Sequence, residues 1–474
     1  MLLERIYDED LSHASYFIGC QATGDAIVID PSRDISAYQE LAKTNGMRIA
    51  HVTETHIHAD FLSGTRELGN ATGATVHLSG EGGEDWQYGY ENERLTDGDI
   101  ITVGNLELQV VHTPGHTPEH LSFLLTDTVT ADEPGFMFTG DFVFVGDLGR
   151  PDLLDEAAGG VDTRYVGAAQ LYRSLKEKLL PLPDYVQILP AHGAGSACGK
   201  ALGSVPTTTV GYERTFSWWG RHLAAADEQG FVDELLEGQP DAPAYFGRMK
   251  RQNREGPTLL GTRPALPELD LDTVRAGLEK SALTFVDTRD QHGVHTGTVK
   301  DAINIPAWNK PAVHAGWVLD PESDHRPLVL LADGPDTAHH LRSHLIRVGI
   351  DNVEGFVTGF EGLPTFVPDM VAPQDLESID YALLLDVRNK SEFAQGTIPG
   401  AKQLSAGRVL WHQDLLPETG TIISFCQSGV RNSVASSALR RAGHRVVELE
   451  GSYLGWQAAL QQQADLQKQT ALVK

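Results

Sequence analysis

Five short apolar runs in the first 240 or so residues each end in a polar loop that carries histidine or aspartate. The runs are AIVIDPS (26–32), RIAHVTETH (48–56), LELQVVHTPGH (106–116), FMFTGDF (136–142) and VQILPAHG (186–193). Each predicts a buried strand, because a short apolar run bounded by glycine or proline turns fits a strand covered on both faces. Functional groups at strand ends are typical of layered α/β folds. The pattern therefore predicts an α/β protein with a site at the ends of its strands.

Composition limits the class of protein. A chain of 474 residues is too long for one ordinary core, so several domains are expected. Its formal net charge of −28 argues against nucleic acid or an anionic membrane as a partner, since both bind basic surfaces. The three cysteines, Cys20, Cys198 and Cys426, are too few for a disulfide framework and fit a reducing compartment. With charges in the opening MLLERIYDED and no membrane-spanning run, a cytoplasmic protein is expected.

A stretch rich in proline, glycine and charge, residues 237–270, predicts a domain junction. The chain after it is a duplication, in which residues 285–306 match residues 384–405. Matched residues stay 99 positions apart along this segment, which a shared local turn would not do. They are Asp287 and Asp386, Gly297 and Gly396, and Ala302 and Ala401. The expected division is a first domain, a linker and two tandem repeats, over residues 1–240, 241–268, 269–370 and 371–474.

Histidine and aspartate recur at the ends of the apolar runs of the first domain. In chain order they are His56, His58 and Asp60 of H-x-H-x-D, His116 in TPGHTPEH, Asp141 in FTGD and His192 in PAHG. A single histidine at a strand end is ordinarily structural. A whole series of them, each after an apolar run, indicates a metal site.

This series resembles the metallo-β-lactamase superfamily over roughly residues 1–240, and the resemblance implies an αββα sandwich. In that family's two-metal members the loop reads H-x-H-x-D-H, and its last histidine is a ligand of the second ion. Here Phe61 stands at that position and puts an apolar ring in place of the ligand. Asp60 and His192 alone would hold a second hard divalent ion weakly. One metal ion is therefore expected rather than two.

The remaining groups can form a two-histidine, one-carboxylate site from His56, His116 and Asp141. That ligand set with open positions is typical of non-haem Fe(II) oxygenases. In the persulfide dioxygenase branch of the superfamily these three positions hold the iron, so the resemblance implies one Fe(II) per chain. It assigns the orientation of ligands or substrate to the other three residues, His58, Asp60 and His192.

Two further residues of the first domain have open roles. The segment TGDFVFVGDLGRPDL (139–153) resembles the persulfide dioxygenases, and its Arg150 either binds a carboxylate of a thiol carrier or forms a surface or interdomain ion pair. The segment HGAGSACGK (192–200) resembles the bacterial multidomain members. Its Cys198 either carries persulfide sulfur near the substrate channel or is a buried structural cysteine. Cys20, in the apolar run SYFIGC, is expected to pack in the core or near the surface.

The segment ISFCQSGVRNSVASSALRRAG (423–443) predicts an apolar strand, a tight loop and a helix that begins just after Arg431. Cys426 opens the loop, and Gly429 allows a positive φ. Loop amides and the helix N-terminus are expected to point at the sulfur and lower its pKa, which makes a reactive thiolate. Arg431 adds a positive charge suited to an anionic acceptor such as sulfite.

This loop resembles the active loop of rhodaneses, and the flanking DVR (386–388), GTIPGA (396–401) and EGSYLGW (450–456) are rhodanese landmarks. The resemblance makes Cys426 and Arg431 catalytic. It gives substrate contacts to the residues between them, Gln427, Ser428, Gly429 and Val430. A phosphatase of the Cys-x5-Arg type is disfavoured, since the arginine here comes one residue too early.

The middle repeat lacks a cysteine. Aligned by sequence, VLLADGPDTA (329–338) places Asp333 at the position of Cys426 and Ala338 at that of Arg431. An aspartate cannot carry a persulfide. The middle repeat is therefore expected to be a catalytically inactive rhodanese-like domain.

The whole chain resembles the CstB-type persulfide dioxygenase–sulfurtransferases, whose fold is a metallo-β-lactamase domain followed by two rhodanese-like α/β domains. The resemblance implies that O2 oxidises a small persulfide, RSSH, to sulfite at the iron, and that Cys426 passes a second sulfane sulfur to sulfite to form thiosulfate, which detoxifies sulfide. The carrier thiol is left open among glutathione, coenzyme A, bacillithiol or similar, and a homo-oligomer is expected. One rival is a zinc thioester hydrolase of glyoxalase II type with an accessory sulfurtransferase, weakened by Phe61. The other is a non-enzymatic sensor or scaffold, weakened by the intact metal and cysteine residues.

Overall fold

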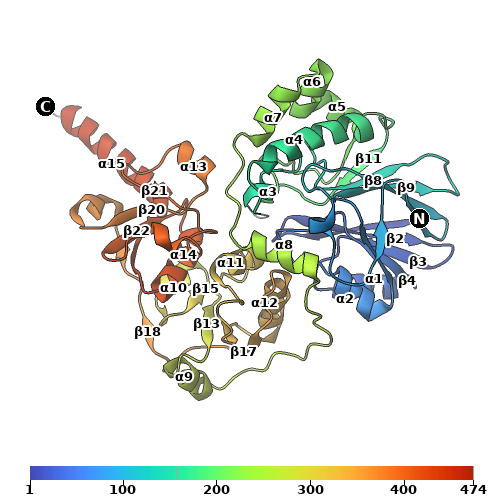
Figure 1. Ribbon diagram of the computed structural model, residues 1–474. Helices are drawn as coiled ribbons and strands as arrows, with labels where there is room; N and C mark the ends of the chain where they lie inside the picture. Colours follow the sequence, from blue (N-terminus) through green and yellow to red (C-terminus); the bar gives the residue numbers. More distant parts are fainter. Residues whose placement is uncertain (157–158, 473–474) are drawn as a thin grey trace. The chain divides into compact units, whose positions relative to one another are not determined.

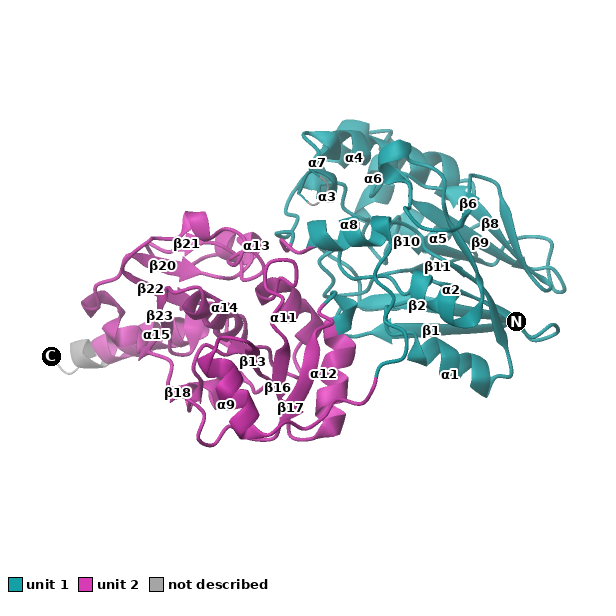
Figure 2. Cartoon of the chain, turned by 60° about the horizontal axis from the view of Figure 1, so that its bottom comes forward, with its two compact units in different colours: residues 1–242, 246–263, 346–349 teal, residues 243–245, 264–345, 350–474 magenta. Residues whose placement is uncertain are grey.

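The computed structural model describes residues 1–156 and 159–472. The chain divides into two compact units, drawn in teal and magenta in Figure 2. Unit 1 consists of Met1–Ala242, Phe246–Arg263 and Ile346–Gly349. Unit 2 consists of Pro243–Tyr245, Pro264–Leu345 and Ile350–Lys474.

Unit 1 contains two six-stranded sheets, ordered β1-β2-β3-β4-β5-β6 and β12-β11-β10-β9-β8-β7. The first sheet is built from β1 (Leu2–Asp8), β2 (His13–Cys20), β3 (Asp25–Ile29), β4 (Arg48–Thr53), β5 (Thr75–Ser79) and β6 (Glu93–Leu95). The second is built from β7 (Ile100–Val103), β8 (Leu106–His112), β9 (Leu121–Asp127), β10 (Phe136–Gly140), β11 (Gln187–Pro190) and β12 (Thr208–Thr209). All five strands predicted from the apolar runs are present, as β3, β4, β8, β10 and β11.

The two sheets pack face to face between two layers of helices (Figure 1). Every residue of β2 is buried, because successive side chains point to opposite faces and both faces are covered. Tyr16 of β2 packs in one cluster with Leu108 of the opposite sheet, whereas the adjacent Phe17 packs with Tyr38 of α1 (Ser36–Thr44) on the outer face. The expected αββα sandwich is therefore confirmed.

Helices cover the outer face of each sheet. On the second sheet, Leu171 of α4 (Thr163–Ser174) packs in one cluster with Ile188 of β11 and Trp219 of α6 (Trp218–Ala225). The remaining helices of unit 1 are α2 (Thr65–Thr72), η1 (Glu84–Trp86), α3 (Leu153–Glu156), α4 (Thr163–Ser174), η2 (Leu175–Leu179), α5 (Val210–Phe216), α6 (Trp218–Ala225), α7 (Glu228–Leu236) and α8 (Phe246–Glu255).

Strand ends bring the histidines and aspartates of unit 1 to one edge of the sandwich. Strands β3 and β4 are parallel, and so are β10 and β11, so their carboxyl ends lie at a common edge of each sheet. His56 follows β4, Asp141 follows β10 directly, and His192 follows β11. The amide of Ala14 donates to the carbonyl oxygen of Ala191 at 2.7 Å and joins the two sheets there.

Unit 2 contains two larger sheets with the same internal strand order. The four-stranded sheet is ordered β15-β13-β16-β17 and the five-stranded sheet β19-β23-β22-β20-β21. Strand β13 lies between β15 and β16, as β20 lies between β21 and β22, and all four pairings are parallel. This agreement in topology matches the duplication read from the sequence.

The first half of unit 2 is built from α9 (Leu271–Glu279), β13 (Thr284–Asp287), α10 (Gln291–His295), β14 (Thr298–Val299), β15 (Ile303–Asn304), α11 (Pro311–Val318), β16 (Leu328–Leu331), α12 (Pro335–Arg347), β17 (Val353–Val357) and β18 (Thr365–Phe366). The second half is built from β19 (Met370–Val371), η3 (Pro373–Ser378), β20 (Leu383–Asp386), α13 (Lys390–Ala394), β21 (Lys402–Gln403), η4 (Gln413–Leu415), β22 (Thr421–Phe425), α14 (Val430–Arg441), β23 (Arg445–Leu449) and α15 (Ser452–Leu472). None of the helices described is both long enough and apolar enough to cross a membrane.

The stretch expected as a linker, residues 241–268, contains a helix. Helix α8 occupies Phe246–Glu255, and Phe246–Arg263 belongs to unit 1. Asn253 of this helix is buried, with 1% of its surface exposed. The sequence analysis expected a linker here from the proline, glycine and charge at both ends, and it missed a helical segment that packs on the first domain.

Candidate functional site

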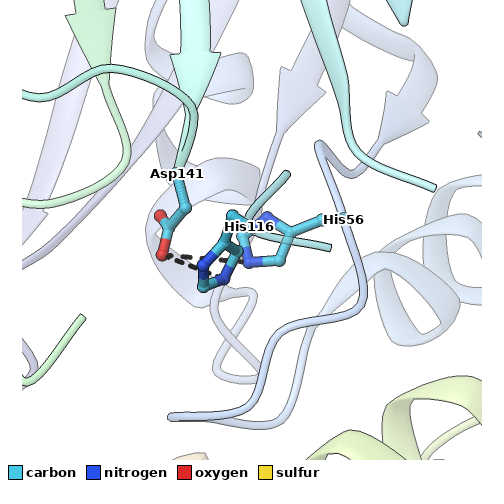
Figure 3. Close-up of side chains that lie close together, drawn as sticks. All are labelled: His56, His116 and Asp141. Atoms are coloured by element: carbon cyan, nitrogen blue, oxygen red, sulfur yellow. Dashed lines mark ion pairs between the residues drawn. The ribbon is translucent and has the colours of Figure 1, made fainter. Parts of the chain in front are cut away.

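The site of unit 1 is a cluster of two histidines and one aspartate (Figure 3). His56, His116 and Asp141 are buried, and one ligand atom from each lies within 4.8 Å of the others. The Nε2 atoms of His56 and His116 are 3.9 Å and 3.5 Å from Asp141 Oδ2. The three residues come from the ends of different strands, so only the folded sandwich brings them together.

Hydrogen bonds on the far side of each imidazole ring orient it toward this cluster. The Thr55 hydroxyl donates to Asp30 Oδ2 at 2.9 Å, so its oxygen accepts the proton of His56 Nδ1 at 3.0 Å. His116 Nδ1 donates to the carbonyl oxygen of Arg150 at 3.1 Å. Both rings therefore carry their proton on Nδ1 and direct the lone pair of Nε2 at Asp141. This is the arrangement that metal-binding histidines require.

The residues present fit a bound cation. Both carboxylate oxygens of Asp141 are buried and have no hydrogen-bond partner within the described part of the chain. A buried charge without a partner is costly unless a cation neutralises it. Burial lowers the pKa of His56 well below its ordinary value, with further lowering from neighbouring histidines, and burial also lowers the pKa of His116. Both rings are thus neutral near pH 7, as metal ligands must be.

Gly140 is a backbone requirement of this site. It adopts φ = +51°, and a Cβ at this position would lie 2.5 Å from Thr55 Oγ1. Glycine alone allows both the left-handed backbone and the close approach of Thr55. It therefore sets the turn that carries Asp141 from β10 into the site.

The other residues of the histidine series surround the three ligands. His58 Nε2 lies 3.1 Å from Asp30 Oδ1, and although burial opposes it, this carboxylate raises the pKa of His58 to about 9. His192 Nδ1 donates to the carbonyl oxygen of Ser12 at 3.1 Å, which leaves its Nε2 3.5 Å from both Asp60 and Asp141. Asp60, His192 and Cys198 form a second buried group of possible ligands beside the first.

Phe61 occupies the place where the two-metal loop pattern has a histidine. Its ring is fully buried and lies 4.6 Å from the ring of His58 and 4.2 Å from that of His13. An apolar side chain therefore fills the space beside Asp60. No ligand atom can reach a second ion from this position.

Several residues that the sequence analysis missed bind the loop of residues 54–63, which carries His56, His58 and Asp60 and is called the metal loop below. Asn253 of α8 donates to the carbonyl oxygens of His58 and Phe61 at 2.8 and 2.7 Å, and its Oδ1 accepts from the amide of Ser63 at 2.9 Å. Glu119 accepts from the amide of Ile57 at 2.8 Å. An asparagine almost 200 residues downstream gives no local signal, so only the tertiary structure could have identified it.

The sequence analysis also missed His120, although this residue ends the segment TPGHTPEH (113–120). The amide of Asp141 donates to His120 Nε2 at 3.1 Å, and His120 Nδ1 donates to the hydroxyl oxygen of Thr113 at 2.9 Å. Both ring nitrogens are therefore occupied. The second histidine of this motif supports the Asp141 turn and does not offer a ligand.

Arg150 does not lie in an open substrate site. It is fully buried, its Nε donates to Asp152 Oδ1 at 2.9 Å, and its Nη1 and Nη2 donate to the carbonyl oxygens of Ala197 and Pro240. Of the two roles expected for Arg150, the structure shows an ion pair: the carboxylate it binds is Asp152, within unit 1. Its contribution to the site is the backbone oxygen that orients His116.

Cys198 and Cys20 are both buried. Burial and the nearby carboxylates of Asp60 and Asp141 raise the pKa of the Cys198 thiol well above its ordinary value. Of the two places expected for Cys20, the structure shows the core between the sheets, where its Sγ accepts from the amide of Asn105 at 3.3 Å.

The sulfur loop of unit 2 follows β22. Cys426 comes directly after the strand, is 1% exposed, and its Sγ accepts from the amide of Gly429 at 3.1 Å. Gly429 adopts φ = +112°, which turns this amide back toward the sulfur. Helix α14 starts at Val430, two residues earlier than predicted, and its N-terminus follows the loop. Gln427 and Ser428 complete the loop, and the carbonyl oxygen of Gln427 accepts from Leu454 at 3.1 Å.

Arg431 already has a carboxylate partner. Its Nη1 and Nη2 donate to Oε2 and Oε1 of Glu392 at 2.6 and 2.8 Å. The expected free positive charge for an anionic acceptor is therefore shared with Glu392. A second arginine contacts the loop, since Arg388 donates from Nη1 to Gln427 Oε1 at 3.1 Å.

The middle repeat differs from this loop in register as well as in residue type. Asp287 pairs with Leu331 in β16, as Asp386 pairs with Phe425 in β22. The residue after the strand, opposite Cys426, is therefore Ala332. The alignment with Asp333 is wrong by one position, because a shorter loop separates β16 from α12 than β22 from α14. Either way the position has no thiol.

Two family models match parts of the chain. The model of the metallo-beta-lactamase superfamily matches residues 8–192, and that of the rhodanese-like domain matches residues 371–459. The mitochondrial persulfide dioxygenase ETHE1 of Bos taurus is 29% identical over 196 residues, covering 40% of this chain and 68% of the relative. A hydroxyacylglutathione hydrolase of Polaromonas sp. (strain JS666 / ATCC BAA-500) is 31% identical over 278 residues, covering 53% of this chain and 98% of the relative.

A solved structure is also similar. The metallo-beta-lactamase from Staphylococcus aureus subsp. aureus COL is 37% identical with a TM-score of 0.65, and the match covers 75% of this chain and 98% of that one. The covered share exceeds unit 1, so the similarity extends into unit 2.

Proposed function

The chain belongs to the metallo-β-lactamase superfamily and has a rhodanese-like domain near its C-terminus, and from this premise we propose that it oxidises small persulfides and then transfers sulfur. The observation that carries the proposal is the cluster of His56, His116 and Asp141 beside an apolar Phe61. Two histidines and one carboxylate with open positions suit a single Fe(II), whereas two-metal hydrolysis needs the ligand that Phe61 replaces.

Fe(II) bound here would supply the electron chemistry that dioxygen requires. The chain's own residues prepare the site for it. Thr55 and the Arg150 carbonyl fix the protons of the two histidines on Nδ1, and Asp141 supplies the negative charge. The proposed overall reaction is RSSH + O2 + H2O → RSH + SO3²⁻ + 2H⁺.

Cys426 performs the second reaction in this proposal. Its thiolate attacks the outer sulfur of a second persulfide, so that RSH leaves and the sulfane sulfur stays on Cys426. Sulfite then attacks that sulfur, which forms thiosulfate and restores the thiolate. The amide of Gly429, 3.1 Å from Sγ, stabilises the negative charge on sulfur. We propose that the middle repeat, with Ala332 at the equivalent position, is a rhodanese-like domain without this chemistry.

A thioester hydrolase is the second candidate, favoured by the hydroxyacylglutathione hydrolase relatives and by the adjacent group of Asp60, His192 and Cys198. Metal content separates the two. Protein purified without added metal should contain close to one iron per chain and consume O2 on addition of glutathione persulfide. Two tightly bound zinc ions, with thioester hydrolysis and no O2 uptake, would establish the hydrolase instead.

Removal of a ligand tests the same site. His116→Ala or Asp141→Ala should abolish both iron retention and O2 uptake, because each removes one of three protein ligands. His222→Gln is a matched control, since His222 lies on α6 and interacts with Asp227 and Glu234, away from the site. Full O2 uptake by His116→Ala would refute the ligand assignment.

A further inference from the structure

Unit 1 has a cavity of about 680 Å³ that borders the loop after His116. Helices α4 and α8, the short helix η1 and the loop after His116 supply its walls. The residues that matter for its chemistry are Trp86, Pro118, Gln170, Lys250, Arg251 and Arg254. This volume suits a small organic molecule.

The cavity has a positive wall in an acidic protein. Lys250, Arg251 and Arg254 lie at positions i, i+1 and i+4 of α8, and Asp85 is the one acid among the described residues that line the cavity. The chain as a whole has 37 basic against 65 acidic residues, so three cations to one acid is a local reversal. Such a reversal indicates an anionic ligand.

The wall is built into the fold. The Lys250 ammonium lies 3.5 Å from the centroid of the Trp86 ring, and Arg254 Nη1 donates to the backbone oxygen of Asp85 at 3.1 Å. These contacts hold α8 and η1 together at the cavity. Two of the three cations are thus held at the cavity by contacts within the fold.

The same helix also contacts the metal loop. Asn253 donates to the carbonyl oxygens of His58 and Phe61, while its neighbours along α8 line the cavity. Pro118 of the cavity wall is two residues from His116, so their Cα atoms are at most about 8 Å apart. A molecule in the cavity therefore lies within one small-molecule length of the metal ligands.

We propose that this cavity binds the anionic part of the persulfide's thiol carrier, through Lys250, Arg251 and Arg254. This inference rests on the proposed persulfide oxidation and makes its substrate specific: the carrier bears carboxylate or phosphate groups. Arginine binds either group through paired N–H donors, and the lysine adds a point charge. In this proposal the cations of α8, and not Arg150, contact the carboxylate or phosphate of the thiol carrier.

The test is oxygen uptake by the full-length, iron-loaded protein with three persulfides. Glutathione persulfide presents carboxylates, coenzyme A persulfide presents phosphates, and 2-mercaptoethanol persulfide has neither. The variant is the double substitution Arg251→Gln and Arg254→Gln, which leaves intact Lys250 and the buried Glu119 that interacts with it. Arg173→Gln with Lys176→Gln is the matched control, because both residues are exposed outside the cavity and the loss of charge is equal.

The double variant should raise KM at least tenfold for an anionic carrier, with kcat within about twofold and no change for the uncharged persulfide. A larger rise in KM for glutathione persulfide identifies carboxylate as the recognised group, and a larger rise for coenzyme A persulfide identifies phosphate. The control should behave as wild type. An unchanged ratio of KM between anionic and uncharged persulfides, or an equal rise in the control, would overturn the site.

Calorimetry with S-methylglutathione and with coenzyme A separates this inference from the proposed function, since neither ligand can be oxidised there as a persulfide. Binding by the wild type that the double variant loses supports the site even if no persulfide is consumed, in which case only the proposed reaction fails. Failure of both ligands to bind the wild type would count against the site, whatever its oxygen uptake.

Discussion

The two halves of unit 2 share a scaffold and differ in one loop. In the first half, Arg289 Nη2 donates to the carbonyl oxygen of Gly297 at 2.7 Å, and Thr298 donates to Asp287 at 2.6 Å. In the second half, the equivalent bonds from Arg388 to Gly396 and from Thr397 to Asp386 are both 2.7 Å. Polar contacts that hold the strands together are thus repeated almost atom for atom.

The loops after β16 and β22 follow different courses. Cys426 faces the amide of Gly429, whereas Ala332 has only a methyl group and the next residue, Asp333, accepts from the hydroxyl of Thr337. Glu392, which binds Arg431, has Gly293 as its counterpart 99 positions earlier. A scaffold maintained by packing can outlast its chemistry, because the reactive groups occupy a loop that contributes little to the core.

The largest expected effect comes from Cys426→Ser. Serine cannot form a stable persulfide at neutral pH, so sulfur transfer stops at its first step, and the middle repeat has no thiol to replace it. Oxygen uptake should remain, because the metal ligands lie in unit 1, while the product changes from thiosulfate to sulfite. Chromatography of derivatised products with an oxygen electrode measures both. Thiosulfate formed at the wild-type rate would end the two-step scheme.

Matched substitutions of Thr397→Val and Thr298→Val sharpen the scaffold comparison. Each removes one hydrogen bond to a buried aspartate and should cost about 1–2 kcal/mol locally. Hydrogen exchange of the full-length chain should then accelerate roughly 5- to 30-fold in the strands of the substituted half alone. Only Thr397→Val should also slow sulfur transfer. Acceleration in both halves from either substitution would show that the halves unfold as one unit.

Glu392→Gln probes the charge on Arg431. Glutamine keeps the side chain that caps α13 but no longer neutralises the guanidinium. The KM for sulfite should fall a few-fold, with kcat within about twofold, in a steady-state assay of thiosulfate formation. A higher KM would mean instead that Glu392 positions Arg431 for the acceptor.

Asp333→Ala should have the smallest effect. Asp333 is exposed and its partner is Thr337 on the following turn, so oxygen uptake and thiosulfate formation should both stay within about 20–30% of wild type. The same two assays measure it, with Asp336→Ala as a control on α12. If Asp333→Ala abolished thiosulfate formation while the fold stayed intact, the middle repeat would take part in the reaction.

Much of this molecule could be predicted from residue order alone. The five apolar runs became strands, and the constant spacing of the repeats became two sheets of one topology. The candidate ligands and Cys426 were recognisable because metal binding and sulfur transfer need particular residue types at strand ends. These inferences depend on periodicity and chemistry, which are local properties.

Tertiary structure decided which polar side chains face the site and which are occupied elsewhere. Arg150 pairs with Asp152 and Arg431 with Glu392, although both arginines looked available in the sequence. His120, which the sequence analysis did not single out, accepts from the amide of Asp141. Asn253 holds the metal loop from a segment whose composition indicated only a linker. The physical reason is that a buried polar group must find a partner wherever the fold places one, and that partner can lie at any distance along the chain.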